Sequence, residues 1–422
     1  MAAAEHFDVV VVGRSLAGLL TAALLARRKY RVRVMDCQGA APLERVPLFG
    51  DTSRVVGRVL DELGLQHDLR TRLDGAWKPV TLALPDRRGL LPTTLTDRGR
   101  ELGELFGGHS AALVALFDAV EVFGESLDPL LAGDIEPPFG WLRGRAWQRV
   151  FDGTAARRLA DEPPPWTTDE AVRPMIRALL RVAGQNDDAR GAMTARGARA
   201  LWHLCHGVVP IRDGRAGFAR MVGEKLDVLG GALDREGQRR PASGVEVQRR
   251  RVRAVTTSDG GRIGAEVVIL AGGEPDLARL WPEAPAPAVV RGQRLAVKVR
   301  ASDRPVDLRD PCGWIPSPEA PAHLVRVADD QMVISWVGDG TPPLDRLVPF
   351  AHVEEIDHAP LPFPVDGRHD PLGLYARPYQ GPLKNLLYTG EWVLPGLGLE
   401  GACFTAWQVA AEVERVGPKR RR

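Results

Sequence analysis

The sequence predicts an α/β fold with a parallel sheet, and three features support that prediction. Residues 8–36 have the pattern of a strand, a glycine turn, a helix and a second strand. Residues 386–409 repeat the order of strand, glycine-rich loop and helix near the other end of the chain. The length of 422 residues suits two domains, or one domain interrupted by another. Together these features indicate a Rossmann-like domain that is discontinuous in sequence.

The N-terminal unit begins with Asp-Val-Val-Val-Val at 8–12, a β-branched run typical of a strand that is buried on both faces. A helix rich in Ala and Leu is predicted over 16–28, and an alternating strand over 30–36. Gly13 would allow the tight turn between strand and helix, and Gly18 would allow the helix to approach the strand closely.

The middle position of the expected G-x-G-x-x-G pattern is occupied by Ser15. That position normally lets the backbone approach a pyrophosphate, which rests on amide groups at the helix N-terminus. The Ser15 side chain could crowd the phosphate or hydrogen-bond to it, and the sequence leaves both open. Asp36 ends the second strand, where a carboxylate accepts from ribose hydroxyls and disfavours a 2′-phosphate. The unit therefore predicts a dinucleotide site, the alternative being an ordinary Rossmann-like unit without a ligand.

The C-terminal unit consists of a short apolar strand at 386–388, then Thr-Gly-Glu-Trp, then a glycine-rich loop at 395–401 and a helix from Ala402. Such a loop brings backbone amides close to a ligand at a helix N-terminus. This order resembles the C-terminal flavin motif of the phytoene desaturase-like branch of the FAD-dependent amine oxidase superfamily.

The resemblance implies that FAD is the cofactor, that a carboxylate binds near its ribityl chain and phosphate, and that the glycine loop lies against the flavin ring. In the C-terminal motif it assigns cofactor contacts to Gly390, Glu391, Pro395, Gly396, Gly398, Gly401 and Ala402. In the N-terminal motif it assigns them to Gly13, Ser15, Leu16, Ala17, Gly18 and Asp36.

A third segment, 208–280, is similar to the part of that family's cofactor domain that contains a hairpin and a return strand. A helix is predicted over 216–229, and residues 249–280 read as strand, Asp-Gly-Gly turn and strand. The resemblance places a backbone contact with the adenosine half of the cofactor near Val252.

The resemblance also implies the domain boundaries. The FAD-binding domain would comprise residues 1–75, 205–290 and 380–422, and an inserted α+β substrate domain would comprise 76–204 and 291–379. In the second domain we predict helices over 111–131 and 169–184 together with a mixed sheet.

The implied activity is that of an FAD-dependent oxidoreductase that removes hydride from an apolar small molecule, with isoprenoid or carotenoid-like compounds as the candidate class. The flavin carries the hydride step, so no catalytic acid or base is assigned. An amine or amino-acid oxidase of the same superfamily is an alternative. The chain departs from the family at Ser15 and at 39–42, where Gly-Ala-Ala-Pro replaces a Gly-Gly pair. These departures support a third hypothesis, a non-catalytic protein that keeps the fold and binds a ligand or partner.

The charge is nearly balanced, with 56 basic and 54 acidic residues, which gives no argument for nucleic acid as a partner. No segment reaches the 18 or so uncharged apolar residues of a membrane span, and no signal peptide is recognised. Four widely spaced cysteines fit buried thiols in a reducing cytoplasm. The basic residues 418–422 leave peripheral contact with an anionic membrane open beside a solvated terminus. The sequence does not predict an oligomeric state.

Three further groups of residues are candidates for a functional or a structural role. His203, Cys205 and His206 lie close together, but no fourth ligand stands near them, so no metal is predicted. Trp336 lies in an alternating strand and is predicted to be a core residue. Thr52 or Ser53 is predicted to cap a helix over 54–63.

Overall fold

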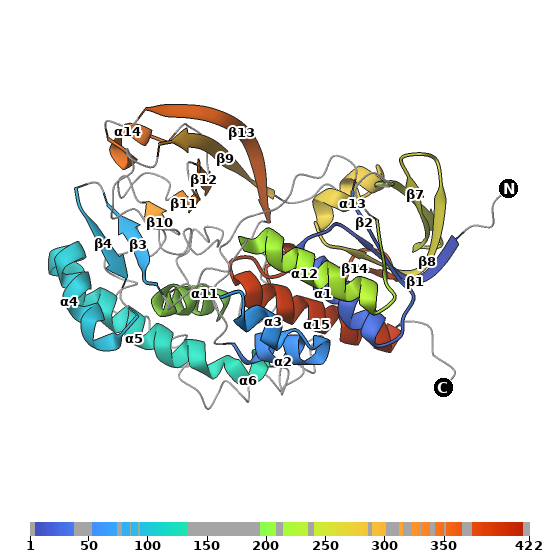
Figure 1. The fold of residues 1–422 in the computed structure, drawn as a ribbon, viewed down its shortest axis with the longest axis horizontal. Helices are drawn as coiled ribbons and strands as arrows, with labels where there is room; N and C mark the ends of the chain where they lie inside the picture. The colour runs from blue at the N-terminus through green and yellow to red at the C-terminus, as the bar shows by residue number, and fades with distance from the viewer. Residues whose placement is uncertain are drawn as a thin grey trace.

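The computed structural model describes residues 5–37, 53–73, 78–84, 86–91, 93–132, 195–207, 214–234, 240–285, 289–300, 312–314, 323–328, 331–337, 342–349, 352–364 and 374–416. Within these residues the chain forms two seven-stranded sheets. The sheets lie on opposite sides of the molecule, and a group of helices runs between and beneath them (Figure 1).

The first sheet has the strand order β5-β2-β1-β8-β7-β6, and β14 also pairs with β8. Its strands are β1 (Glu5–Val12), β2 (Val32–Met35), β5 (Ala232–Leu233), β6 (Ala242–Gln248), β7 (Arg251–Thr257), β8 (Arg262–Leu270) and β14 (Leu386–Tyr388). Strand β1 is parallel to both of its neighbours, with Val9 opposite Val32 on one side and Val267 on the other. Strands β7 and β6 extend the sheet as an antiparallel pair. The predicted α/β class and parallel arrangement are confirmed.

Helix α1 (Leu16–Arg27) connects β1 to β2, and all but its last residue are buried. Its Ala and Leu residues favour a helix and also supply apolar surface on every side. The helix ends where Lys29 takes a φ of 68° and the amide of Tyr30 still donates to the carbonyl of Leu25. For this reason β2 starts at Val32, two residues later than the sequence pattern predicts.

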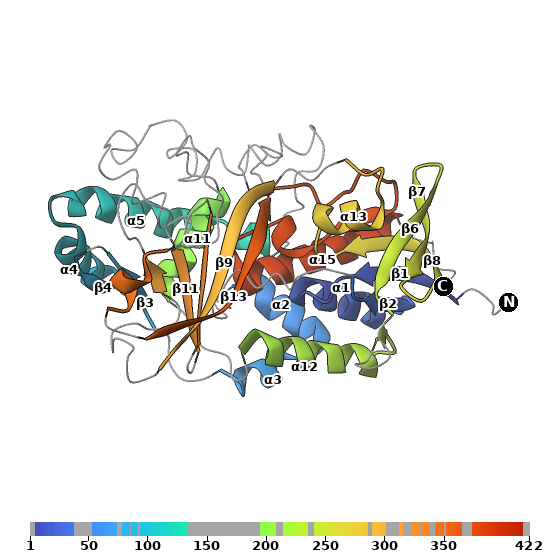
Figure 2. The same ribbon diagram turned by 90° about the horizontal axis from the view of Figure 1, so that it is seen from above.

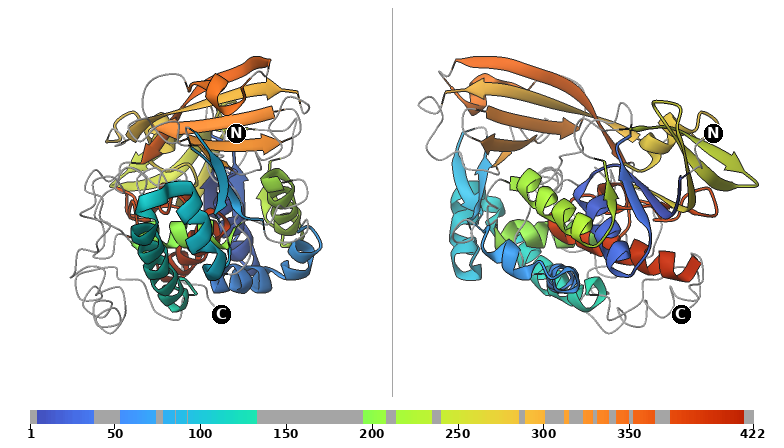
Figure 3. Two further views of the ribbon diagram at one scale, coloured as in Figure 1. Left: turned by 90° about the vertical axis from the view of Figure 1, so that its left-hand side faces the viewer. Right: turned by 45° about the vertical axis from the view of Figure 1, so that its right-hand side comes forward.

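Helices α12 (Gly214–Val228) and α15 (Gly398–Val416) pack against α1. Figure 2 and Figure 3 show both helices running beside α1 from distant parts of the chain. The short helix α13 (Glu274–Leu280) follows β8. The part of the fold around the first sheet is therefore assembled from three separate stretches of sequence.

Helix α2 (Arg54–Leu63) has the bounds that the sequence predicts, and Gly64 ends it in the left-handed conformation at φ 67°. It is followed by α3 (Gln66–Arg70). Ser53 occupies the N-cap position, but its buried hydroxyl makes no hydrogen bond to any described residue, so the predicted side-chain cap by Ser53 is wrong. Thr52 lies outside the described residues.

The second sheet has the order β13-β9-β12-β11-β10-β3-β4. Its strands are β3 (Val80–Ala83), β4 (Arg88–Leu91), β9 (Val289–Val299), β10 (Cys312–Trp314), β11 (His323–Ala328), β12 (Gln331–Val337) and β13 (Val353–Pro364). The β10–β3 pair is parallel and the other pairs are antiparallel, so the sheet is mixed. Trp336 on β12 is buried in the small core of this sheet, as predicted.

Helices accompany the second sheet: α4 (Leu95–Phe106), η1 (Gly107–His109), α5 (Ser110–Ser126), α6 (Asp128–Leu131), α11 (Ala195–His206) and α14 (Leu344–Leu347). The single helix predicted over 111–131 is divided into α5 and α6, because Pro129 has no backbone N–H to continue the ladder. The helix predicted over 169–184 lies outside the described residues. The division into two domains with the predicted boundaries stays a prediction.

In the described part of the chain, no helix is long and apolar enough to cross a membrane. All four cysteines are buried and none is in a disulfide, which confirms the predicted buried thiols.

Candidate functional site

The glycine turn lies at the carboxyl ends of β1 and β8. Gly13 takes a φ of 103°, and its amide donates to the carbonyl of Met35 at 2.7 Å. A Cβ on Gly18 would lie 2.8 Å from both the Cβ of Ala271 and the carbonyl oxygen of Gly13. Both positions therefore need glycine, one for its backbone conformation and the other for the close approach of α1 to the end of β8.

Ser15 is the N-cap of α1. Its hydroxyl accepts from the amide of Gly18 at 3.2 Å and lies 3.5 Å from the carbonyl of Ala271. The side chain is thus bonded within the turn. The amides of Leu16 and Ala17 have no hydrogen-bond partner among the described residues, and both residues are almost fully buried. These two N–H groups at a helix N-terminus suit an anion.

Asp36, directly after β2, contacts Arg14 through its side chain and Ala242 through its backbone. The Oδ2 of Asp36 is 3.7 Å from the Nη1 of Arg14, a residue of the glycine turn. The carbonyl of Asp36 accepts from the amide of Ala242 at 2.7 Å, so the start of β6 lies next to this end of β2. Cys37 follows, and burial raises the pKa of its thiol to about 12.

Val252 does not lie at this end of the sheet. Both of its backbone groups bond to the side chain of Asn385, with the amide donating to Oδ1 at 2.9 Å and the carbonyl accepting from Nδ2 at 2.8 Å. The β7–β8 pairing ends with Ala254 opposite Gly264, and Asn385 also donates from Nδ2 at 2.8 Å to the carbonyl of Glu266, four residues before the carboxyl end of β8. Ala242 is the hairpin residue that the structure brings next to Asp36.

The C-terminal loop meets the N-terminal turn directly. A Cβ on Gly390, whose φ is 85°, would lie 3.1 Å from the Cβ of Ala17 and 3.8 Å from the hydroxyl of Ser15. The amide of Gly390 donates to the hydroxyl of Thr405 on α15 at 3.0 Å. These contacts bring together the two glycine motifs, which lie more than 370 residues apart.

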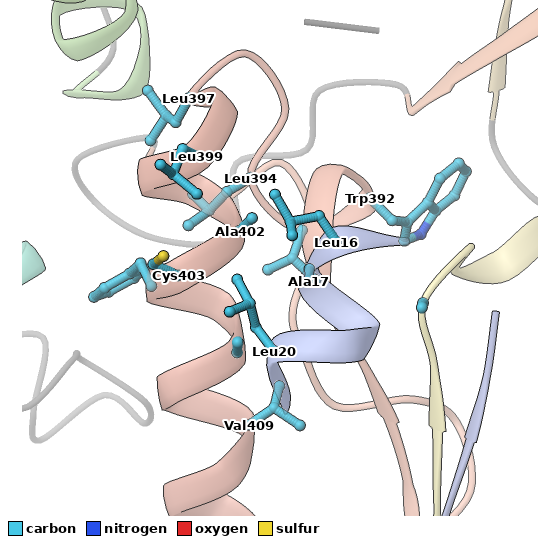
Figure 4. Close-up of a cluster of buried hydrophobic side chains, with 14 of the residues drawn as sticks. Leu16, Ala17, Leu20, Trp392, Leu394, Leu397, Leu399, Ala402, Cys403 and Val409 are labelled. Atoms are coloured by element: carbon cyan, nitrogen blue, oxygen red, sulfur yellow. The ribbon is translucent and has the colours of Figure 1, made fainter. Parts of the chain in front are cut away.

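The rest of the loop packs on α1 and α15. Figure 4 shows Leu394, Leu397 and Leu399 gathered with Leu16 and Ala17 at the beginnings of the two helices. Pro395 and Gly401 are buried, and Gly396 and Gly398 have the positive φ values of 86° and 52°. Ala402 is buried in the same core. Glu391 is a partly exposed residue of η3 (Gly390–Trp392), and Trp392 packs over Gly273.

A buried cluster of charged residues, which the sequence did not predict, joins α11 to the first turn of α15. Arg199 donates from Nε and Nη2 to the two carboxylate oxygens of Glu400, at 2.9 and 2.7 Å. It also donates to Asp128 at 2.5 Å and to the carbonyl of Gly124. His203, one turn further along α11, has its Nε2 2.8 Å from the second carboxylate oxygen of Glu400.

The charges of this cluster are set by burial and pairing. Burial alone would raise the pKa of Glu400, but the Arg199 guanidinium and His203 outweigh it and hold the pKa of that carboxyl far below its usual range. Burial lowers the pKa of His203. Its neutral ring can donate to the carboxylate. His206 instead contacts Glu121 and the carbonyl of Trp202.

Asp276, on α13, is a second buried acid whose pKa is shifted by the fold. Its buried carboxylate accepts from Arg279 at 2.9 Å, and burial raises its pKa from 3.8 to about 6. A raised pKa in the folded state contributes stability below the unfolded value, which is lost as the pH rises through the folded value. We therefore expect Asp276→Asn to raise the free energy of unfolding at neutral pH by about 1–3 kcal/mol.

The measurement is chemical denaturation at several pH values. The advantage of Asp276→Asn over the wild type should grow between about pH 4 and pH 7. The exposed Asp61, changed to Asn, is the control and should show no such trend. An Asp276→Asn variant that is less stable than the wild type at neutral pH would contradict the expected sign.

The first sheet, with the glycine turn at the carboxyl ends of its parallel strands, defines a Rossmann-like α/β fold. No protein-family model matches the chain, and no curated protein matches it in sequence. Among solved structures, an oxidoreductase from Methanosarcina mazei is similar with a TM-score of 0.55 and 13% identity, over 96% of this chain and 99% of that one. The Rab GDI of Plasmodium falciparum is similar with a TM-score of 0.54 and 10% identity, over 99% and 100%.

A third similar structure is a triple variant of the flavin-dependent brominase Bmp2. Its TM-score is 0.50 at 10% identity, and the match covers 97% of this chain and 80% of that one. At these identities the likeness shows the fold.

Proposed function

We propose that the protein binds FAD and acts as an FAD-dependent oxidoreductase. The observation that carries the proposal is the meeting of the two glycine motifs at the start of α1, where Gly390 lies against Ala17. The fold supports it, because an oxidoreductase and a flavin-dependent brominase share that fold.

The residues at this place fit a dinucleotide. The amides of Leu16 and Ala17 would hold the diphosphate, and Asp36 would accept from the ribose hydroxyls. A side chain at Gly390 would fill the space beside Ala17 and Ser15. When bound, FAD supplies a hydride acceptor. The chain's own contribution is to hold and orient the cofactor. We assign the flavin end to Glu391, to Pro395 and Gly396 in the loop, and to Gly398, Gly401 and Ala402 in the first turns of α15.

For the substrate we propose an apolar small molecule, with isoprenoid compounds as the candidate class. Support comes from the resemblance of the C-terminal loop to the flavin motif of phytoene desaturase-like proteins. The second sheet would contribute the substrate side of the site. The basic residues 418–422 would suit contact with an anionic membrane that holds such a substrate.

The test is anaerobic reduction of the FAD-loaded protein. Candidate isoprenoids and, separately, amines and amino acids are added, and the visible absorbance of the flavin is followed. Bleaching by an apolar compound is the expected result. Bleaching by amines alone would replace this substrate class with that of an amine oxidase.

A second candidate is a non-catalytic binding protein on the same fold. The departures from the family at Ser15 and at 39–42 support it, and the Rab GDI of Plasmodium falciparum shares the fold. A purified protein that takes up an apolar ligand without ever binding FAD would establish this candidate in place of the oxidoreductase.

A further inference from the structure

Arg14 occupies a variable position of the glycine turn, yet its side chain reaches the nucleotide-binding carboxylate. Its Nη1 lies 3.7 Å from the Oδ2 of Asp36, and both side chains are about 30% exposed. The guanidinium therefore spans the distance from the turn, where the diphosphate would rest, to the end of β2, where the ribose would bind. A dinucleotide that touches both places must pass this cation.

Ser15 makes a cation useful here. Its hydroxyl accepts from the amide of Gly18, one of the N–H groups at the start of α1 that have no partner within the helix. Two first-turn amides, those of Leu16 and Ala17, are left without partners among the described residues. A diphosphate at this turn thus meets fewer backbone donors than the first turn of a helix can offer.

The balance of charge also favours a cation at this position. A diphosphate brings about two negative charges to a place where Asp36 already carries one. The helix N-terminus offsets only about half a charge. A guanidinium adds a full positive charge and several donors in a planar fork that matches phosphate oxygens.

We propose that Arg14 is a phosphate-binding residue of this site and replaces the donor that Ser15 withdraws from the turn, an inference that rests on the proposed FAD site. Arg14 pairs with Asp36 in the structure and would turn to the diphosphate when the dinucleotide binds.

The experiment compares the wild type with Arg14→Gln by titration with FAD and by competition with ADP and with adenosine. We expect Arg14→Gln to raise the Kd for FAD and for ADP roughly tenfold, as loss of a charged hydrogen bond does. Adenosine, which has no phosphate, should compete equally well with both proteins. Arg27→Gln, at the exposed far end of the same helix, is the matched control and should bind as the wild type does.

A double-mutant cycle tests the link to Ser15. Ser15→Gly returns the Gly18 amide to the turn, so the loss caused by Arg14→Gln should be smaller in that background. Equal Kd values for FAD in the wild type and in Arg14→Gln would overturn the inference and leave the FAD site standing.

A wild type that binds ADP in an Arg14-dependent manner but does not bind FAD would keep the phosphate role and overturn the proposed function. Binding of neither ligand would overturn both. Thermal unfolding of each ligand-free variant checks that the substitution has not disturbed the fold.

Discussion

Glu400→Gln is expected to lower the free energy of unfolding by about 3–5 kcal/mol, the cost of breaking a buried ion pair. The carboxylate receives two donors from Arg199 and one from His203, and all three side chains are almost completely buried. The neutral amide would leave the Arg199 guanidinium without its main counter-charge. Since Arg199 also binds Asp128 and Gly124, the loss would loosen α5, α6 and α11 together.

Denaturant unfolding of wild type and variant measures this effect. Glu414→Gln is the matched control, because Glu414 lies on the same helix and pairs with Arg28 at 3.4 Å but is half exposed. An exposed pair of that kind contributes about 0–1 kcal/mol. A Glu400→Gln variant as stable as the Glu414→Gln control would show that the cluster does not hold the helices together.

The pH dependence of this difference has a definite sign. The folded state lowers the pKa of Glu400, so the pair contributes stability above the ordinary carboxyl pKa and loses it as the pH falls. The gap between wild type and Glu400→Gln should therefore narrow below about pH 4.

The second large effect is expected from Gly18→Ala. The added methyl group would lie 2.8 Å from the Cβ of Ala271 and from the carbonyl of Gly13, well inside contact distance. Either α1 or the end of β8 must move, at a cost of about 1–3 kcal/mol. Because the amides of Leu16 and Ala17 move with α1, FAD affinity should fall as well.

Gly103→Ala provides the control for this substitution. Gly103 is also within a helix, and a Cβ there meets no atom within 4 Å. That variant should gain up to about 1 kcal/mol from helix propensity and bind FAD unchanged. The free energy of unfolding and the Kd for FAD are measured for both variants. A Gly18→Ala protein with the same stability and the same FAD affinity as Gly103→Ala would contradict the close packing of α1 on β8.

The N-terminal unit was predictable because its signals are local. The valine run, Gly13 and the Ala- and Leu-rich helix each follow from neighbouring residues, and the structure has β1, α1 and β2 within two or three residues of the predicted bounds. Contact of the C-terminal loop with this unit was implied by the family resemblance, since no local pattern relates Gly390 to Ala17.

Other features depend on contacts between residues far apart in the chain, and no sequence pattern relates those residues to each other. Arg199 and Glu400 are 201 residues apart, and neither stands in a recognisable motif with the other. The sequence offered one indication of a buried acidic partner, namely two basic side chains, Arg199 and His203, one turn apart on α11. The hairpin β6–β7 has two register shifts, and no local pattern in the sequence indicates that the amide of Ala242 bonds to the carbonyl of Asp36. The role of Ser15 likewise required the position of Ala271, 256 residues away.

In the proposed site, the glycine turn of α1 and the segment from Gly390 to Ala402 together bind FAD. The most direct measurement is the visible absorbance spectrum of the purified protein, with any released cofactor identified and its stoichiometry determined after incubation with FAD. The expected result is a flavin spectrum, with FAD as the released species and about one equivalent bound per chain. A protein that stays colourless after incubation with FAD would contradict it.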